Sequence, residues 1–371
     1  MTRRTPVPAD GVGRVRPPVP ADVAGWVLLL SLLCVAVLLG ACGEKAEPDP
    51  SAGSGGGDAQ PLRLVLDYFP NADHAGIYAA DETGAYANAG LDVTITPPPD
   101  PAAPLKLLLA GRTDLAISYE PELLLARDKG ADLVAVGALV QKPLTSLISV
   151  GKANIRTPQD LRGKRVGTSG IPYQSAYLQT ILRTAGVDPE SVQETNVGFN
   201  LVPAMLSGKV DATLGAFWNY EGVDLARRGR DPVIQRVEEL GVPTYAELVF
   251  VARRRDLDSS FAARVRRFMQ ATARGHAALE ADPQAGLAGL LNADKGLDRG
   301  LQEAVVKATL PVFFPTEPER GFGYQDPAEW QRYADWMLEN DLITQPQNAE
   351  QVVTNEFLAG EGLDPGRLSQ D

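Results

Sequence analysis

The chain has 371 residues, with 47 acidic against 35 basic side chains, and its net charge of −12 argues against nucleic acid as a partner. It contains two cysteines and two histidines, so a multi-histidine metal site is excluded. Both cysteines, Cys34 and Cys42, lie at the N-terminal end, which leaves the rest of the chain without a disulfide, a thiol nucleophile or a cysteine metal ligand. We therefore expect no bound metal.

Residues 1–41 are predicted to be an export signal. Basic residues precede an uncharged apolar run, VAGWVLLLSLLCVAVLL, and the small residues Gly40 and Ala41 come directly before Cys42. This ending resembles the bacterial lipobox, in which the cysteine is lipidated. An ordinary transmembrane anchor is the alternative, because the run is near the lower length limit for spanning. Residues 42–61 are rich in Gly, Ser and Pro and predict a flexible tether, so we expect a lipid anchor at the extracytoplasmic face of the cell membrane.

From residue 62 onward, short apolar runs alternate with longer amphipathic segments, and the pattern after residue 252 is almost entirely helical. The predicted strands are residues 62–68, 91–96, 115–119, 133–139, 146–150, 165–168, 192–197, 212–216, 232–236 and 248–252. The predicted helices among them are residues 75–86, 104–110, 121–129, 175–185 and 201–207. Strands that alternate with helices predict parallel sheets and an α/β fold.

A second lobe is predicted to begin within TPQDLRGKRVGTSG, at residues 157–170. Pro158 stands where the first turn of a helix tolerates proline, and Gly163 ends that helix before a new strand. The length after the signal also favours two lobes over one hydrophobic core. We expect residues 62–150 and 251–371 to form one lobe and residues 151–250 the other, with a hinged cleft that bends near Val150 and Val251.

Candidate ligand-binding residues follow the predicted strands, because open α/β sheets bind ligands at the carboxyl ends of their strands. The first lobe contributes Asp67, Tyr68, Asn71, His74, Tyr119 and Glu120. The second lobe contributes Gly170, Tyr173, Asn200, Trp218, Asn219 and Glu221, and Tyr245 and Glu247 flank its return strand. Aromatic rings stack on a flat ligand, and amides and carboxylates bond its edge. The pattern predicts a planar polar heterocycle, neutral or weakly cationic.

Structural roles for some of these residues stay open. Asp67 suits a turn, Glu120 suits the N-terminus of a helix, and Trp218 alone suits a core. His74 lacks both the partners of a metal site and the nucleophile of a catalytic one, which leaves ligand contact or a turn scaffold, and we favour contact. An anionic ligand would require Arg, Lys or a richer glycine nest than the turn that contains Gly170.

The segment LDYFPNADHAGIYAADETGAYANAGLDV, residues 66–93, resembles the opening of the thiamine-pyrimidine precursor family. That family includes solute-binding proteins of ABC importers for formylaminopyrimidine-type compounds and the fungal hydroxymethylpyrimidine phosphate synthases. The likeness covers roughly residues 62–340 and continues through LAISYEPELLLARDKG, TPQDLRGKRVGTSG, GKVDATLGAFWNYEG and PTYAELVFVA.

The resemblance implies a two-lobed periplasmic-binding-protein fold of the second type without a cofactor. It implies a binding protein that delivers a formylaminopyrimidine or hydroxymethylpyrimidine type of precursor to ABC permease subunits. The cleft residues that it implies are Asn71, Tyr119, Glu120, Trp218, Asn219 and Glu221.

Three alternatives remain at this point. The first is an enzyme, either a pyrimidine synthase or a hydrolase that uses His74 and Asp67. The fungal synthases use a cysteine-rich loop near iron, whereas no cysteine follows Cys42 here. The second is a carrier of nitrate, taurine or another sulfonate, since such wider relatives share the fold but lack the Pro-Asn-x-x-His block. The third is a sensor ectodomain or a scavenger without a transporter.

Overall fold

The structure is a computed structural model that describes residues 59–315 and 320–359. The predicted signal peptide, Cys42 and most of the predicted tether lie outside the described residues. Within the described ranges, none of the helices combines the length and the apolar character needed to cross a membrane.

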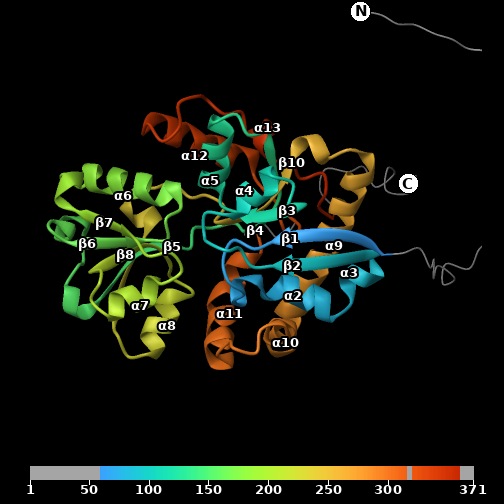
Figure 1. The fold of residues 1–371 in the computed structure, drawn as a ribbon, viewed down its shortest axis with the longest axis horizontal. Coiled ribbons are helices and arrows are strands. Elements are labelled where there is room, and N and C mark those ends of the chain that lie inside the picture. The colour runs from blue at the N-terminus through green and yellow to red at the C-terminus, as the bar shows by residue number, and fades with distance from the viewer. Residues whose placement is uncertain (1–58, 316–319, 360–371) are drawn as a thin grey trace, which may run out of the picture. The chain divides into compact units, whose positions relative to one another are not determined.

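Two five-stranded sheets form two lobes, which we call lobe 1 and lobe 2 (Figure 1). The sheet of lobe 1 has the order β2-β1-β3-β10-β4, with β1 at Gln60–Val65, β2 at Leu91–Thr96, β3 at Leu115–Ser118, β4 at Leu133–Val140 and β10 at Leu248–Arg253. The sheet of lobe 2 has the order β7-β6-β8-β5-β9, with β5 at Thr145–Val150, β6 at Arg165–Thr168, β7 at Gln193–Asn196, β8 at Ala212–Phe217 and β9 at Pro232–Arg236. The predicted strands are confirmed.

One strand in each sheet runs opposite to its neighbours and directly follows a crossing between the lobes. β10 pairs antiparallel with β3 and β4, and β5 pairs antiparallel with β8 and β9, while the other pairings are parallel. The sheets are therefore mixed. β5 belongs to the second sheet, which corrects the predicted lobe boundary at residue 150. The chain crosses at residues 141–144 and returns at residues 241–247, whereas Val150 and Val251 lie within strands.

Short helices connect the strands. The helix predicted at residues 75–86 is wrong in its continuity, because Gly84 adopts a left-handed φ of 69° and separates α2 from α3. α6 begins three residues earlier than predicted, at Pro172, because proline fits the first helical turn. The connecting α-helices are α2 Ala75–Glu82, α3 Ala85–Asn88, α4 Pro104–Leu109, α5 Glu120–Asp128, α6 Pro172–Thr184, α7 Leu201–Leu206 and α8 Glu221–Arg227. The 3-10 helices are η1 Ala72–His74, η2 Gly151–Ala153, η3 Pro158–Leu161, η4 Pro189–Ser191, η5 Val237–Leu240 and η6 Arg254–Asp256.

The helical pattern after residue 252 is confirmed. The helices of this region are α9 Ser259–Ala281, α10 Pro283–Ala293, α11 Arg299–Phe313, α12 Pro327–Glu339 and α13 Ala349–Val352. Each begins after an Asp or Asn whose side chain accepts a backbone N–H of the first turn, which satisfies a donor that the helix itself leaves unpaired. α9 and α10 pack against α2, so they belong to lobe 1 (Figure 1).

The carboxylate of Glu247 joins the two crossings. It accepts the backbone N–H groups of Leu144 at 2.7 Å and Thr145 at 2.8 Å, and the hydroxyl of Tyr245 at 3.0 Å. Glu247 is fully buried, and burial raises its pKa to about 7. A single acid on the returning segment thus holds the start of β5, and the two crossings form one hydrogen-bonded hinge.

Helices α2 and α9 approach each other closely because glycines face each other between them. A Cβ atom at Gly76 would lie 2.4 Å from the ring of His276, and one at Gly275 would lie 2.1 Å from the carbonyl oxygen of Gly76. His276 is buried, and its Nδ1 lies 2.9 Å from the carbonyl oxygen of Thr272. Burial lowers the pKa of His276 to about 4. The second histidine of the sequence is therefore a neutral core residue.

Gly76→Ala is expected to lower the free energy of unfolding by about 1–3 kcal/mol, because the added methyl group forces α2 and α9 apart. Urea unfolding measures this change. Gly151→Ala is the matched control, since a Cβ there would lie 3.6 Å from its nearest neighbour, an ordinary contact distance. Equal stability of the two variants would contradict the close packing of α2 against α9.

Candidate ligand-binding site

A cavity lies between the lobes, where the carboxyl ends of β1, β3, β6 and β8 face each other. Lobe 1 lines it with Asp67, Tyr68, Asn71, Asp73 and Tyr119. Lobe 2 lines it with Ser169, Gln174, Leu201, Gly215, Phe217, Tyr220 and Glu221. Five of the predicted site residues are among them, namely Asp67, Tyr68, Asn71, Tyr119 and Glu221. We call this cavity the cleft site.

Asp67 is held in the cleft site by two hydrogen bonds. Its Oδ1 lies 2.8 Å from Nε2 of His74, and its Oδ2 accepts the hydroxyl of Tyr119 at 2.8 Å. Nδ1 of His74 accepts the backbone N–H of Asn71 at 3.3 Å, so the ring proton resides on Nε2 and is donated to Asp67. His74 is fully buried and does not line the cavity. In this arrangement His74 orients Asp67 from the side that faces away from the cavity.

Asp73 brings a second carboxylate to the cleft site. It lies in η1, and the side chain of Asn71 caps this short helix by accepting the N–H of Asp73 at 2.8 Å. Oδ1 of Asp73 accepts Nδ2 of Asn219 at 2.6 Å and the hydroxyl of Thr309 at 3.2 Å. Its Oδ2 is buried without a hydrogen-bond partner among the described residues, and burial raises the pKa of Asp73 to about 6. Asp73, which lines the cavity, thus has a buried acceptor oxygen that no described residue uses.

Glu221 supplies the third carboxylate, from the first turn of α8. Its Oε2 accepts the backbone N–H of Phe217 at 2.8 Å, which fixes the side chain against the end of β8. Glu221 is buried, and the loss of hydration raises its pKa to about 8. A buried carboxyl group of this kind gains from a ligand that donates a hydrogen bond or carries positive charge.

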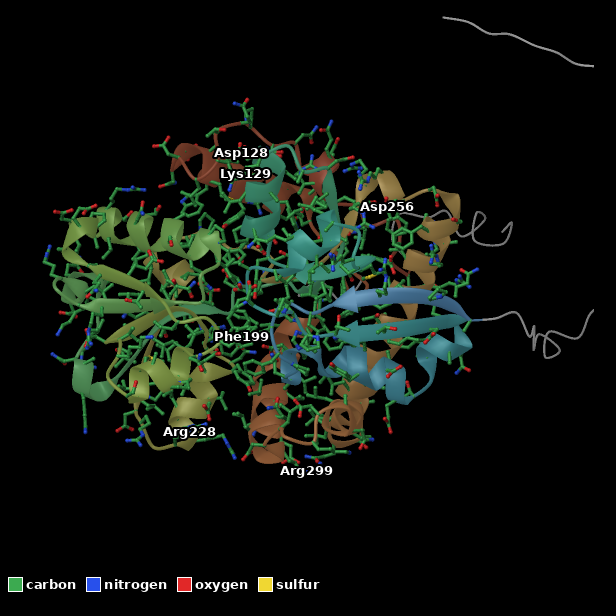
Figure 2. All side chains as sticks on the ribbon, in the orientation of Figure 1. Asp128, Lys129, Phe199, Arg228, Asp256 and Arg299 are labelled. Carbon is green, nitrogen blue, oxygen red and sulfur yellow. The ribbon has the colours of Figure 1, made fainter. Side chains whose placement is uncertain are left out.

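Aromatic rings from both lobes meet beside the cavity. The ring centroid of Tyr68 lies 4.4 Å from that of Phe69 and 4.6 Å from that of Phe199, and Phe69 lies 5.9 Å from Tyr220. The hydroxyl of Tyr68 donates to the carbonyl oxygen of Phe199 at 3.0 Å, a bond that crosses from lobe 1 to lobe 2. Figure 2 shows Phe199 between the two lobes. Of these rings, Tyr68 and Tyr220 line the cavity and provide aromatic surface for a planar ligand.

The wall on lobe 2 contains residues that the sequence did not single out. Gln174 reaches back from α6, and its Oε1 accepts the N–H of Ser169 at 2.8 Å while its Nε2 donates to the hydroxyl of Ser169 at 2.9 Å. Gly215 makes room for this amide, because a Cβ there would lie 2.2 Å from Nε2 of Gln174. A glycine inside a strand is a signal of close approach and could have indicated this wall.

Four predicted cleft residues lie at the hinge instead. Glu247 and Tyr245 bond each other within the hinge, and Tyr173 is buried with its ring 5.4 Å from that of Tyr119. Glu120 accepts the N–H of Ala246 through Oε2 at 2.7 Å, and its own N–H donates to the carbonyl of Ala246 at 3.3 Å. The strand ends that border the cleft also border the crossings, so these residues support the hinge without lining the cavity.

The remaining predicted residues also lie away from the cavity. Trp218 donates its Nε1–H to the carbonyl of Pro143 at 3.1 Å and carries the guanidinium of Arg236 over its ring, so it packs on the first crossing. Asn219 is buried and bridges Asp73 of lobe 1 to α11 through its bond to Thr309. Gly170 packs against Asn196 with a φ of 81°, and Asn200 is exposed beside α7.

The cleft site is rich in hydrogen-bond acceptors and poor in positive charge. Asp67, Asp73 and Glu221 face it, and no Lys or Arg belongs to the described residues that line it. Nor does the described part of the chain contain a group of three or more His, Cys, Asp and Glu residues placed to hold a metal ion. This arrangement suits a flat ligand that offers N–H donors along its edge, and it is unsuited to an anion.

Two mixed sheets joined by two crossings, with a cavity between the lobes, define the type 2 periplasmic-binding-protein fold. The solved structure of the alkanesulfonate-binding protein SsuA from Xanthomonas axonopodis pv. citri, bound to MOPS, matches the fold with a TM-score of 0.62. Its sequence identity is 20%, and the match covers 80% of this chain and 99% of that chain.

The chain belongs to the NMT1/THI5-like family, whose model matches residues 71–286, and it is a solute-binding protein of that family. It is similar to the formylaminopyrimidine-binding protein of Halalkalibacterium halodurans, with 31% identity over 88% of this chain and 98% of the relative. It is also similar to the 4-amino-5-hydroxymethyl-2-methylpyrimidine phosphate synthase of Legionella pneumophila, with 26% identity over 80% of this chain and 92% of that enzyme. The family therefore contains both binding proteins and synthases.

His74→Ala is expected to lower the free energy of unfolding by about 2–4 kcal/mol, because it removes a buried ring and leaves Oδ1 of Asp67 without a donor. In a double-mutant cycle with Asp67→Ala, the two changes are expected to couple by about 1 kcal/mol or more. Urea unfolding of the four proteins measures the coupling. The matched control is His276→Ala with Asp67→Ala, which should be additive because that buried histidine bonds Thr272. Additive effects of His74 and Asp67 would refute the orienting role.

Glu221→Gln is expected to stabilise the ligand-free protein above about pH 5. In the unfolded chain the carboxyl ionises near its ordinary pKa of 4.5, whereas the folded pKa is about 8. The folded state therefore binds more protons between these values, and the free energy of unfolding falls as the pH rises through that window. The amide removes the contribution of Glu221 to this slope, and the gain should reach about 1–3 kcal/mol at the upper end.

Thermal or urea unfolding between pH 5 and pH 8 tests the effect of Glu221→Gln. Glu356→Gln, at an exposed position, is the matched control and should leave the pH dependence unchanged. The slope should become smaller in Glu221→Gln without vanishing, because Asp73 and Glu247 also have raised pKa values, at about 6 and about 7. A slope equal to that of the wild type would show that Glu221 does not titrate in this range.

Proposed function

We propose that this protein is a lipid-anchored, extracytoplasmic solute-binding protein of an ABC importer that binds a thiamine pyrimidine precursor. The ligand would be of the formylaminopyrimidine or hydroxymethylpyrimidine type. Cys42 would carry the lipid, and the tether of residues 42–61 would connect the two lobes to the membrane surface. The loaded protein would hand its ligand to the permease subunits.

The unused acceptor of Asp73 carries this proposal. An aminopyrimidine has an exocyclic amine with two N–H donors next to ring nitrogens, so its edge complements a carboxylate oxygen that lacks a partner. Glu221 lies in the same cavity and offers a second acceptor, while Asp67 is held in place by His74 and Tyr119. The rings of Tyr68 and Tyr220 line the same cavity and would face the planes of the pyrimidine.

The charge of the cleft site favours a pyrimidine over an anion. A sulfonate, taurine or nitrate would meet three carboxyl groups without a compensating guanidinium or ammonium group among the described lining residues. The similarity to the alkanesulfonate-binding structure therefore supports the fold and does not extend to its ligand. The similarity to the formylaminopyrimidine-binding protein agrees with the chemistry of the cavity.

Binding rather than synthesis is the activity that we propose. The sequence has no cysteine after Cys42, so it lacks the cysteine-rich loop of the fungal synthases that the first motif resembles. His74 is occupied on both ring nitrogens, by the N–H of Asn71 and by Asp67. A histidine with both nitrogens bonded is positioned as a scaffold and not as a free base.

The lobes are closed in this structure, and the cleft site has a volume of about 20 Å³, room for about one water, so the lobes must part to admit a pyrimidine. The bond from the hydroxyl of Tyr68 to Phe199, and the contacts of Asn219 with Asp73 and Thr309, join the lobes on the two sides of the cavity. Each of these bonds must break for the lobes to open, while the bonds of Glu247 lie within the hinge. Ligand entry would therefore exchange interlobe hydrogen bonds for ligand contacts.

Calorimetric titration of residues 59–371 tests the proposed ligand. Formylaminopyrimidine or hydroxymethylpyrimidine is expected to bind with a Kd of about 1 μM or below, as is suitable for a capture protein. Taurine serves as the anionic control and is expected to give no binding. Silence with both pyrimidines, together with binding of taurine, would overturn the ligand assignment.

Asp73→Asn provides the sharpest variant for the same titration. The amide keeps Oδ1 for Asn219 and Thr309 but replaces the unused acceptor with an N–H donor. The Kd should rise by about tenfold or more, since an N–H facing another N–H repels the ligand. Glu356→Gln is again the control, and an unchanged Kd in Asp73→Asn would exclude contact at that oxygen.

A further inference from the structure

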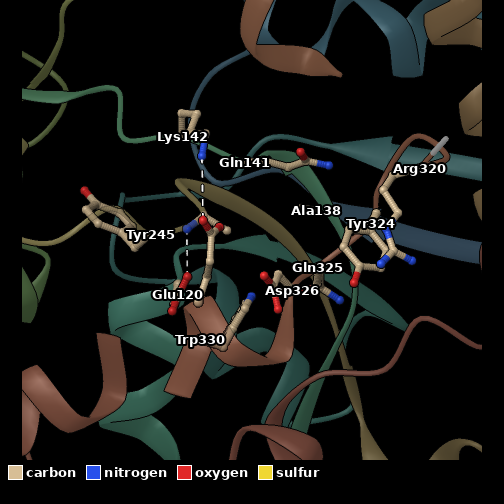
Figure 3. Close-up of a pocket in the computed structure, with 12 residues that line it drawn as sticks. Glu120, Ala138, Gln141, Lys142, Tyr245, Arg320, Tyr324, Gln325, Asp326 and Trp330 are labelled. Carbon is tan, nitrogen blue, oxygen red and sulfur yellow. Dashed lines mark hydrogen bonds and ion pairs between the residues drawn. The ribbon is translucent and has the colours of Figure 1, made fainter. Parts of the chain in front are cut away.

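A second cavity lies behind the hinge, on the side of lobe 1 where α12 begins (Figure 3). It has a volume of about 190 Å³, and a single water needs only about 10–15 Å³ of the same kind of space. Both crossings contribute to its wall, and the rest comes from β4, α5 and the segment around α12. The lining residues are Glu120, Ala138, Gln141, Lys142, Tyr245, Ala246, Arg320, Tyr324, Gln325, Asp326, Glu329 and Trp330. We call it the rear cavity, and none of these residues lines the cleft site.

Two buried acceptors of the rear cavity have no partner among the described residues. Glu120 is 1% exposed, and while its Oε2 accepts the N–H of Ala246, its Oε1 is unpaired. Gln325 is 2% exposed, and its Oε1 is also unpaired. The amide of Gln325 cannot simply be reversed, because its Nε2 donates to the carbonyl oxygens of Ala135 at 3.3 Å and Thr354 at 3.4 Å.

Unpaired buried oxygens are costly, and a single such group typically destabilises a protein by about 1–3 kcal/mol. The rear cavity places two of them, together with the unpaired Nε2 of Gln141, around one space. Further acceptors stand at its edge, where Asp326 precedes α12 and Glu329 lies 4.0 Å from Nζ of Lys142. Dashed lines in Figure 3 mark the ion pair of Lys142 and the hydrogen bond that Glu120 accepts. Lys142 and Arg320 also line the cavity, but Lys142 is paired with Glu329 and the guanidinium of Arg320 lies 4.2 Å from the ring centroid of Tyr324. Two of the three unpaired groups on the described lining residues are acceptors, which favours a ligand that donates hydrogen bonds.

We propose that the rear cavity is a second binding site and that it takes a small primary amine. The ammonium group would donate to Oε1 of Glu120 and Oε1 of Gln325, and its three N–H donors exceed what either oxygen alone could accept. Tyr245 and Trp330 line the same space and provide aromatic surface for the carbon atoms next to a cation. Burial raises the pKa of Glu120 well above its usual range, and a bound cation would restore the ionised form.

A ligand in the rear cavity would act on the hinge. Glu120 bonds the backbone of Ala246 in the returning segment, and Gln141 belongs to the first crossing. Tyr119, the neighbour of Glu120, lines the cleft site on the opposite side. If the amine binds the open and closed lobes with different affinities, it shifts the equilibrium between them. The size of the shift equals the difference between the two binding free energies. The site is independent of which solute occupies the cleft site.

Calorimetric titration of residues 59–371 with methylammonium and with ethanolamine tests the site directly. At least one amine should bind saturably, and tetramethylammonium, which has the charge but no N–H donor, should not. Glu120→Gln should weaken the amine by about tenfold or more, because it removes the ionisable oxygen while the amide oxygen can still accept from Ala246. Glu122→Gln is the matched control, since this buried acid of the same helix bonds Ser118 and lies outside the rear cavity.

Glu329→Gln keeps the test decisive if Glu120→Gln fails to fold, because this side chain is 37% exposed and its replacement leaves the core intact. It should weaken the amine by about threefold. The proposal is overturned if both amines bind more weakly than about 10 mM. It is equally overturned if tetramethylammonium competes, or if the affinity is the same in wild type and both rear-cavity variants.

Discussion

The bonds of the Glu247 carboxylate hold together the hinge on which the two-lobed arrangement depends. This one acid lies on the returning segment and accepts two backbone N–H groups at the start of β5, so the segments that cross between the lobes are connected to each other. Because the group is fully buried, its bonds are not weakened by competition with water. The two crossings are therefore held to each other by a buried carboxylate that accepts backbone N–H groups.

The cleft site shows how function and stability oppose each other in this protein. Asp73 and Glu221 are buried carboxyl groups whose pKa values lie at about 6 and about 8, so the ligand-free fold holds protons that an exposed carboxyl would release. A fold selected only for stability would replace them with amides or apolar groups. Their presence where Asp67 is already oriented by His74 gives the cavity an excess of acceptors, and this excess selects a donor ligand.

Tyr119 and Glu120 are adjacent in the sequence, but the structure gives them different roles. Both follow β3, and a rule based on strand ends assigns both to the cleft. In the structure Tyr119 bonds Asp67 inside the cleft site, whereas Glu120 begins α5 and bonds Ala246 on the rear side of the hinge. The turn from strand to helix rotates successive side chains to different sides. As a result, Glu120 contacts the returning segment at Ala246, whereas Tyr119 contacts Asp67.

The sequence by itself determined the ten strands and the α/β class, and the strand ends that it indicated supply five of the residues that line the cavity. These features depend on local apolar periodicity and on turn residues, which can be read along the chain. Tertiary structure decided the rest: β5 pairs with β8, Trp218 packs on the first crossing, and His74 orients Asp67 from behind. The physical reason is that a side chain's role depends on its partner across space. The hydrogen-bond partners of Glu247 and Asn219 are distant in the sequence, and that of His74 depends on a tight turn. A local sequence pattern does not predict such contacts.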